Sequence, residues 1–566
     1  MKKFSKFVIH NLSFILFFLF VFTLSPITYH LSLAFGAPHI SGKHIPGQPK
    51  DHVHKIPDVR QLRAIGLSPK AIREAIGATG VKKVAVILVW FPSAGTTTSG
   101  QNTIDNFTQI KDYLTGLTTF YREVSYNGAL DIQVTPFPNW TTAYQMPNPM
   151  QYYGASTIPN GGATNDVYYN TYLLFKNALE AAGTSVSTGT YDAVMVLHSG
   201  YGQESGGKDG DIWSMMLGPW TALDIGGTIV NGFNEGTVVP ALELGGNSPF
   251  GVICHEFGHQ LGLPDLYNSV TGATQVGKWC LMDFGTWAVN GSSPSHPSIW
   301  CKDFLSWVNP IEVSISSINC TLSPIEISSQ AIKIPVETGS GQEYFLLEYR
   351  RKNEPLANYD KGLPGEGILI WHIDDTIGSV ANNDINNYTT RRVDLEEADS
   401  SDPSTNYGDS NDPWKQTTQT FSAPQSNANN TTLSGVTVTD FTGSGGSAMS
   451  FNILKTKISA EVTVAKAYNF PNPFPIPAEQ KTTIKFTLTR PTTRIEVRIY
   501  NLPGELVYTI PYEKIKIVTA DDYKYVYQTD PWEGMNQEGE KLASGVYFYV
   551  IKADKETKVG KLAIIR

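Results

Sequence analysis

The run HEFGHQLGLPD at residues 255–265 constrains this chain more than any other segment. On a helix, His255 and His259 are four positions apart and project from one face, so that both imidazoles can reach one metal ion. Gly262 can adopt the left-handed backbone that ends a helix, and the chain can then turn and bring Asp265 back towards the same ion. The run therefore predicts a helix that ends beside a metal-binding turn.

The number of ligands in this run indicates its chemistry. His255, His259 and Asp265 would supply three protein ligands to a zinc ion and leave a position for water, whereas structural zinc sites close the shell with four protein ligands. Glu256 is next to His255 on the helix, where its carboxylate can reach that water and act as a general base. For the HExxH core alone, a helix with two histidines and no metal is the alternative. Because Gly262 can end the helix and Asp265 can then supply a third ligand, we favour metal-assisted hydrolysis.

Length and composition bound the class of protein. A chain of 566 residues exceeds one ordinary domain, and about two to four domains are expected. The hydrophobic content of 41% is enough for packed cores, while the charged content of 17% is below the globular average of about 25%. With a formal net charge of −9 and no long basic run, nucleic acid is excluded as an expected partner.

The first residues have the pattern of an export signal. Three lysines precede an apolar run over residues 12–24, and Ala34 and Gly36 supply the small residues of a cut before Ala37. The apolar run is shorter than the ~20 residues that a membrane span needs. We predict a signal peptide over residues 1–36 and no stable membrane span after its removal; a retained anchor is the alternative.

Four cysteines lie within or just after the predicted catalytic region: Cys254, Cys280, Cys301 and Cys320. An exported protein permits disulfides, and four cysteines allow three pairings. A bridge between Cys254 and Cys280 could brace the site, and free buried thiols are equally compatible with the sequence.

The chain is predicted to be multidomain. Residues 37–80 form a propeptide or an N-terminal arm with a helical pattern at residues 59–76. Residues 81–310 combine buried strands with an amphipathic helix at residues 106–125, which favours an α/β catalytic domain.

Strand patterns dominate the second half of the chain. Residues 311–455 are predicted to be a β-rich accessory module. Its acid-rich loop at residues 399–411 could bind Ca²⁺ through oxygen ligands, or simply be solvated, because no EF-hand spacing is present. Residues 460–566 form a separate unit with the pattern of a small β-sandwich.

The metal-binding segment resembles the immune inhibitor A family of secreted bacterial metalloproteases, whose motif is HEFGHxLGLPD. Residues 277–287 (GKWCLMDFGTW) resemble the methionine turn of that family. Further similar segments extend the resemblance over roughly residues 80–455; they are residues 120–126, 198–213, 343–348 and 363–374.

The resemblance implies a zincin-like, metzincin-type catalytic domain. It implies His255, His259 and Asp265 as zinc ligands, Glu256 as the general base, and Met282 as structural support beneath the metal. Some related proteases place a substrate-polarising tyrosine two residues after the methionine, but this chain has a phenylalanine there. Other residues could take this role or be structural; they are Tyr267, His198, His296 and His372.

The last hundred residues resemble the sorting domains of the type IX secretion system, which have an Ig-like sandwich of the flagellar-hook-capping type. The similar segments are residues 469–474, 500–505, 545–549 and 560–566. The resemblance implies passage across an outer membrane, with cleavage or surface attachment to follow. An adhesive or spacer sandwich is the alternative.

Together these features predict a secreted or cell-surface, zinc-dependent endopeptidase that hydrolyses peptide bonds through a zinc-bound water activated by Glu256. Its expected partners are protein or peptide substrates and the export machinery. Two alternatives remain: a secreted zinc hydrolase of non-peptide amides or esters, and a surface-binding protein with a vestigial protease fold. The intact Glu256 argues against the second, because a binding protein has no need of that carboxylate.

Overall fold

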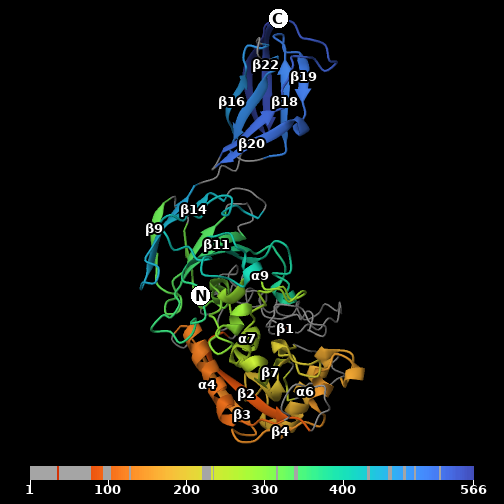
Figure 1. Cartoon of the computed structure of the whole chain (residues 1–566), viewed down its shortest axis with the longest axis vertical. Coiled ribbons are helices and arrows are strands. Elements are labelled where there is room, and N and C mark those ends of the chain that lie inside the picture. Colours follow the sequence, from red (N-terminus) through yellow and green to blue (C-terminus); the bar gives the residue numbers. More distant parts are fainter. Residues whose placement is uncertain are drawn as a thin grey trace, which may run out of the picture.

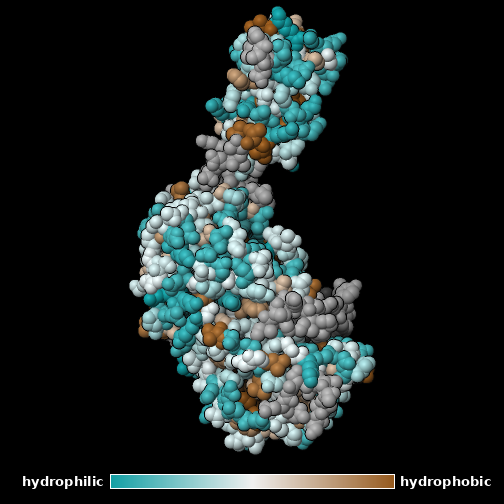
Figure 2. Space-filling view, in the orientation of Figure 1, coloured by the Kyte–Doolittle hydropathy of each residue, from teal (hydrophilic) through white to brown (hydrophobic). Residues whose placement is uncertain are grey.

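The computed structural model describes residues 35–36, 78–92, 103–126, 129–218, 231–233, 235–313, 317–336, 342–429, 434–456, 462–475, 480–489, 492–521 and 524–566. The helical pattern predicted at residues 59–76 lies outside these residues, as does nearly all of the predicted signal peptide. Figure 1 shows a large body with the C-terminal sandwich set off at one end. The surface in view is largely hydrophilic, with apolar residues in small separate groups (Figure 2).

A seven-stranded sheet in the order β1-β6-β7-β5-β2-β3, with β4 beside β2, forms the centre of the N-terminal half. The apolar run of β2 is buried on both faces, since Val84, Val86 and Leu88 enter one core while Ala85 and Ile87 enter another. The strands β7, β5, β2 and β3 run parallel, and β6 and β1 are antiparallel additions at one edge. The strand bounds are β1 Phe35–Gly36, β2 Gly80–Trp90, β3 Leu130–Phe137, β4 Tyr144–Gln145, β5 Ala193–Tyr201, β6 Met215–Leu217 and β7 Gly236–Leu242.

Helices cover both faces of this sheet, which confirms the predicted α/β arrangement. The amphipathic helix predicted at residues 106–125 is α4, Phe107–Val124, and it packs with α7, Phe250–Gln260, in one core. On the other face, α6 contributes most of the helical side chains of the second core. The remaining helices here are α5 Met150–Gly154, α6 Val167–Ala182 and α8 Ile299–Phe304.

A five-stranded sheet in the order β13-β12-β11-β10-β8 follows, and both of its faces are buried. Leu346 and Trp371, which face each other across β11 and β12, enter the same core as α4 and α7. Phe345 and Ile370 point the other way, into a core shared with the sheet β14-β15-β9. On one side the sheet therefore belongs to the same core as α4 and α7. The bounds are β8 Ile311–Glu312, β9 Ile318–Leu322, β10 Ile332–Pro335, β11 Glu343–Arg350, β12 Gly367–Asp374, β13 Val393–Glu396, α9 Pro403–Asn406, β14 Val436–Thr442 and β15 Met449–Lys455.

Apolar and polar residues alternate through residues 436–454, and the structure divides this segment into β14 and β15. The two strands pair antiparallel, and the turn between them contains Gly443 and Gly445, both with positive φ. Alternation of side chains continues through both strands, so it cannot reveal the turn.

The C-terminal unit consists of two antiparallel four-stranded sheets, β16-β17-β21-β20 and β19-β18-β22-β23, which share one core. Phe486 and Tyr527 from one sheet and Val497 and Tyr549 from the other belong to this core. The bounds are β16 Val464–Phe470, β17 Thr483–Leu488, β18 Ile495–Tyr500, β19 Leu506–Ile510, β20 Ile515–Asp521, β21 Lys524–Thr529, β22 Gly545–Ala553 and β23 Glu556–Ile564. Among the described residues, no helix combines the length and hydropathy that crossing a bilayer requires.

The four cysteines are free and buried. Cys254 and Cys280 form no disulfide, and the Cys280 Sγ lies 3.9 Å from the Cys301 Sγ.

Candidate functional site

Helix α7 presents His255 and His259 on one face and ends where the sequence predicts. Its last residue is Gln260, and Gly262 then takes a positive φ of 98° that turns the chain. Gly258, between the histidines, lies close to the Met282 side chain, because a Cβ at this position would lie 2.9 Å from the Met282 sulfur. The helix and the methionine turn therefore pack closely together at Gly258 and Met282.

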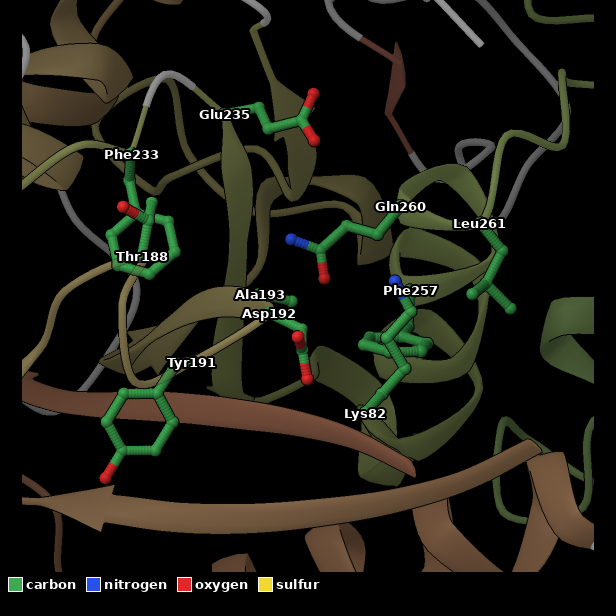
Figure 3. Close-up of a pocket in the computed structure, with 10 residues that line it drawn as sticks. All are labelled: Lys82, Thr188, Tyr191, Asp192, Ala193, Phe233, Glu235, Phe257, Gln260 and Leu261. Carbon is green, nitrogen blue, oxygen red and sulfur yellow. The ribbon is translucent and has the colours of Figure 1, made fainter. Parts of the chain in front are cut away.

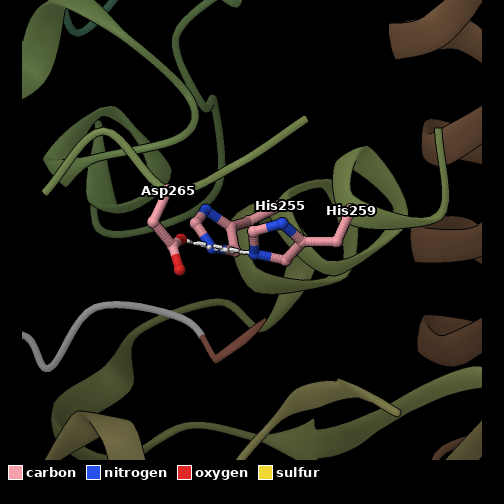
Figure 4. Close-up of side chains that lie close together, drawn as sticks. All are labelled: His255, His259 and Asp265. Atoms are coloured by element: carbon pink, nitrogen blue, oxygen red, sulfur yellow. Dashed lines mark hydrogen bonds and ion pairs between the residues drawn. The ribbon is translucent and has the colours of Figure 1, made fainter. Parts of the chain in front are cut away.

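The two histidines and Asp265 converge on one point (Figure 4). The His255 Nε2 lies 3.1 Å from the His259 Nε2. The Asp265 Oδ1 lies 3.2 Å from the first nitrogen and 3.3 Å from the second. All three side chains are buried, and Asp265, the most exposed of them, is only 2% exposed.

These distances fit a zinc ion. Ligands at about 2.0–2.1 Å from a tetrahedral zinc are about 3.3 Å apart, close to each edge of the observed triangle. The opposite ring nitrogens are held by the backbone, with the His255 Nδ1 3.0 Å from the Leu281 carbonyl and the His259 Nδ1 2.7 Å from the Leu263 carbonyl. Since each Nδ1–H donates to a carbonyl, both Nε2 atoms present lone pairs to the centre of the triangle.

The charge state of Asp265 suits a metal ligand. Burial alone would raise the pKa of Asp265, but the adjacent His259 and His255 lower it to about 2. Burial lowers the pKa of His259, and Asp265 only partly opposes this. The site therefore favours a carboxylate beside neutral imidazole.

Asn383, which sequence reasoning missed, holds Asp265 from the accessory module. Its side-chain Nδ2 donates to the Asp265 Oδ2 at 2.6 Å, and its Oδ1 accepts the Asp265 backbone N–H at 2.7 Å. Asn383 follows a short 3₁₀ turn and has a positive φ of 51°. Asparagine is common in turns, and several asparagines lie nearby in this segment. The sequence therefore does not mark Asn383 as the partner of Asp265.

Asp283 holds the methionine turn together. Its Oδ2 accepts the backbone N–H groups of Gln275, Val276 and Gly277 at 2.8, 2.7 and 3.0 Å. Burial raises the pKa of Asp283 to about 6, against the lowering effect of these hydrogen bonds.

A backbone hydrogen bond joins the methionine turn to the segment that carries Asp265. The Met282 carbonyl accepts the Leu266 N–H at 2.8 Å. Because Leu266 directly follows Asp265, this bond links the support beneath the histidines to the third converging side chain.

Tyr267 lies beside this centre and Glu256 follows His255 on α7, whereas the other candidate side chains lie elsewhere. Glu256 is fully buried on α7, next to His255 in sequence. The Tyr267 ring stacks against the His255 ring with centroids 6.5 Å apart. Phe284, which occupies the position of the tyrosine in some relatives, packs on Tyr407 with ring centroids 4.5 Å apart.

The three remaining histidines are held in other environments. His198 is buried on β5 with its Nδ1 2.8 Å from the Ser199 carbonyl. The His296 Nε2 lies 2.9 Å from Glu123, and His372 lies between two glutamates on the accessory sheet. None of the three belongs to the cluster of His255, His259 and Asp265.

A cavity of about 320 Å³ lies beside α7, near the starts of β2 and β5 (Figure 3). Phe257, Gln260 and Leu261 line it together with Lys82 and Ala193, from the first residues of β2 and β5. In open parallel sheets, ligands bind at the carboxyl ends of the strands, whereas this cavity is at their amino ends. Neither His255 nor His259 lines it. The cavity is therefore separate from the candidate metal centre.

Two family models match the chain. Residues 178–308 match the catalytic domain of immune inhibitor A peptidase M6. The chain carries an M6 peptidase domain. The matched residues of this M6 domain include α7, the turn at Met282 and all three converging side chains. Residues 478–564 match the CHU_C type IX secretion signal domain, so the C-terminal sandwich carries a secretion signal domain.

Two curated relatives each match 23% of the chain. The pre-pro-metalloprotease PrtV of Vibrio cholerae serotype O1 (strain M66-2) is 33% identical over 152 residues, which are 23% of this chain and 16% of that protein. Immune inhibitor A of Bacillus thuringiensis subsp. alesti is 36% identical over 156 residues, which are 23% of this chain and 22% of that protein. The chain thus spans less than a quarter of the length of these relatives.

Two solved structures from Porphyromonas gingivalis show weaker likeness. PorZ, a surface component of the type IX secretion system, is 15% identical over 42% of this chain and 37% of its own, with a TM-score of 0.14. Dimeric latent PorU is 17% identical over 36% of this chain and 18% of its own, with a TM-score of 0.15. These scores are too low to support a conclusion about fold or function.

Proposed function

We propose that this protein is a secreted, zinc-dependent endopeptidase. The observation that carries the proposal is the convergence of the His255 Nε2, the His259 Nε2 and the Asp265 Oδ1 on one buried point, at the spacing of a tetrahedral zinc. The M6 domain and the relatives named as metalloproteases support the same reaction class.

In this proposal, the chain's own residues orient the metal and move the proton. A zinc ion, when bound, supplies a Lewis acid that polarises the scissile carbonyl and lowers the pKa of a coordinated water to about 7. The Glu256 carboxylate accepts the proton of the attacking water and returns it to the leaving amine. The backbone bonds to both Nδ1 atoms keep the imidazoles oriented, and Met282 fills the space beneath α7.

The edge of the main sheet favours a peptide substrate over a small ester or amide. At this edge, β1 pairs antiparallel with β6, and α7 contacts both strands. An extended peptide can therefore add to the sheet beside the metal centre through main-chain hydrogen bonds. If the signal peptide is cut before Ala37, as the sequence predicts, β1 leaves with it and β6 becomes free to pair with substrate.

The finer architecture and the route of export belong to the same proposal. We infer that the N-terminal half has a metzincin-type fold, because α7 leads through Gly262 to the third ligand and Met282 lies beneath it. The C-terminal sandwich is inferred to be Ig-like and to direct the enzyme through the type IX secretion machinery to the cell surface or beyond. The secretion signal domain at residues 478–564 supports this location.

Replacement of Glu256 by Gln tests the mechanism. In the purified protein, Glu256→Gln is expected to lower casein hydrolysis by about 10²- to 10⁴-fold while zinc content stays at one ion per chain. Glu180→Gln, an exposed change on α6, is the matched control and should retain activity. Equal activity of the native protein and Glu256→Gln would refute the general-base role, and absence of zinc in both would refute the site.

The two alternatives give different results in the same assay. Hydrolysis of small esters or amides but not of casein or a panel of peptides would favour the non-peptide hydrolase. A protein that binds zinc and hydrolyses none of these substrates would favour a surface-binding protein with a vestigial fold.

A further inference from the structure

The acid-rich loop between β13 and β14 is docked on the methionine turn. The Tyr407 carbonyl accepts the Lys278 N–H at 3.0 Å, and a Cβ on Gly277 would lie 2.5 Å from that carbonyl oxygen. The Trp279 indole Nε1 donates to the Asp412 Oδ2 at 2.7 Å. Because Trp279 is only three residues before Met282, the position of this loop bears directly on the support of the proposed zinc site.

Three carboxylates meet in this loop: Asp399, Asp409 and Asp412 each place an oxygen within 4.8 Å of the other two. Asp399 is exposed, Asp409 is half-buried and Asp412 is buried. Short loop contacts hold the first two, since the Asp399 Oδ1 accepts the Ser401 N–H at 3.0 Å and the Asp409 Oδ1 accepts the Asn411 N–H at 2.7 Å. Backbone N–H groups of the loop therefore orient the Asp399 and Asp409 carboxylates, although these carry the same charge.

Asp412 provides an independent sign of a ligand. Its Oδ2 is used by Trp279 and by the Asp409 N–H at 2.8 Å. Its Oδ1 has no hydrogen-bond donor among the residues that the structure describes, and the side chain is 0% exposed. Buried carboxylate oxygens in native proteins are nearly always satisfied by a donor or a cation. Burial raises the pKa of Asp412 to about 6, and the charges of Asp409 and Asp399 add to this against the lowering effect of its hydrogen bonds.

We propose that Asp399, Asp409 and Asp412 bind a Ca²⁺ ion that fastens the acid-rich loop to the methionine turn. The ligand set consists of carboxylate oxygens without histidine or cysteine, which favours a hard cation over zinc. Ca²⁺ accepts irregular oxygen coordination and suits a loop, whereas Mg²⁺ demands near-ideal octahedral geometry. The ion would neutralise the three like charges and give the Asp412 Oδ1 its partner. This site is independent of the proposed zinc chemistry.

Terbium luminescence tests the proposal directly, because Tb³⁺ has the oxygen preference of Ca²⁺ and is excited through a nearby indole. The zinc-loaded full chain, freed of calcium, should show sensitised Tb³⁺ emission through Trp279, and added Ca²⁺ should reverse it. Asp399→Asn, an exposed change that leaves the buried core intact, should weaken Tb³⁺ binding at least tenfold. Asp412→Asn should do the same. Asp440→Asn, at an exposed aspartate on β14 that accepts a hydrogen bond from Asn452, is the control and should bind as the native chain does.

A thermal readout separates specific from incidental binding. Millimolar Ca²⁺ should raise the Tm of the native chain by about 5 °C and leave that of Asp399→Asn unchanged. Absence of a Ca²⁺-dependent Tm shift in the native chain would overturn the proposal and identify the loop as merely solvated. Equal Tb³⁺ affinity of Asp399→Asn and Asp440→Asn would also overturn it. Because casein hydrolysis is not the readout, failure here is distinct from failure of the zinc mechanism.

Discussion

The accessory module, residues 311–456, and the C-terminal sandwich, residues 462–566, are both β-rich, but they relate to the M6 domain in opposite ways. The module shares a core with α4 and α7 and supplies Asn383 to the proposed ligand Asp265. The sandwich has a core of its own that both of its sheets form. One region therefore shares a core with the helix that carries the candidate site, and the other is built as a separable unit.

Charge placement shows the same contrast. At the boundary of the module, Arg350 is fully buried, and its Nη2 lies 2.7 Å from each carboxylate oxygen of Asp360. Glu326 lies 3.3 Å and Glu348 3.5 Å from the same guanidinium. In the sandwich, the ion pair of Lys481 with Glu533 is 2.7 Å long but about half exposed on both sides. Buried charge is tolerated only where its partners are fixed, which is the case at the boundary and not in the sandwich.

Truncation should give the largest difference between the two regions. A chain that ends at residue 456 should fold, bind zinc and hydrolyse casein at the rate of the full chain, because every buried residue of the sandwich core belongs to the sandwich itself. A chain that ends at residue 310 should be insoluble, since the shared core would lose β11 and β12. Soluble expression and casein hydrolysis check both. An active chain ending at residue 310 would show that the module is dispensable.

Removal of one buried charge should give the second-largest difference between the two regions. Arg350→Met is expected to destabilise the main body by about 3–5 kcal/mol, because Asp360 and its neighbours would be left uncompensated in the core. The corresponding change in the sandwich, Lys481→Ala, should leave Tm unchanged within error, because the pair is exposed. Calorimetry of both variants measures the two regions in one scan. A Tm for Arg350→Met equal to that of the native chain would contradict the inferred role of the network.

The pH dependence of stability should also differ between the regions. His372 lies 2.9 Å from Glu343 and 3.0 Å from Glu396; burial alone would lower its pKa, but the two glutamates raise it to about 9. Because the folded pKa exceeds the ordinary value of about 6.5, this stabilisation is complete below pH ~6.5 and is lost as the pH rises through 9. The stability difference between the native chain and His372→Gln should shrink by about 3 kcal/mol from pH 6 to pH 10. Calorimetry at both pH values measures this, and the sandwich transition, which His372 does not contact, is the internal control.

Asn383 should give a smaller effect confined to the metal. Asn383→Gly removes the hydrogen bonds to Asp265 and keeps the positive φ of 51° that glycine tolerates. Zinc affinity is expected to fall about 10- to 100-fold, as for other groups that orient a metal ligand. Competition with a chromophoric chelator measures the affinity. Asn501→Ala, which removes an exposed bond to Glu505 in the sandwich, is the matched control and should not change it.

Much of the fold and of the candidate site could be predicted from local patterns. The buried strands of the main sheet, helix α4 and the turn at Gly262 all follow from the periodicity of apolar residues and from glycine conformation. His255, His259 and Asp265 could be proposed together because they lie within one short run. Asn383, Asp283 and the meeting of Asp399 with Asp412 could not, because their partners are distant in sequence or are backbone groups that no residue pattern marks.

The pairing of His255 with His259 follows from the sequence alone, since a helix of 3.6 residues per turn brings both onto one face wherever it folds. The sequence also determined the strand content, because alternation of apolar residues depends only on neighbours along the chain. It takes the three-dimensional packing to show that the accessory sheet shares a core with α4 and α7 and that the sandwich does not. The physical reason is that a strand buried on both faces has the same apolar pattern whatever packs against it, so the partner of each face is settled by long-range packing alone.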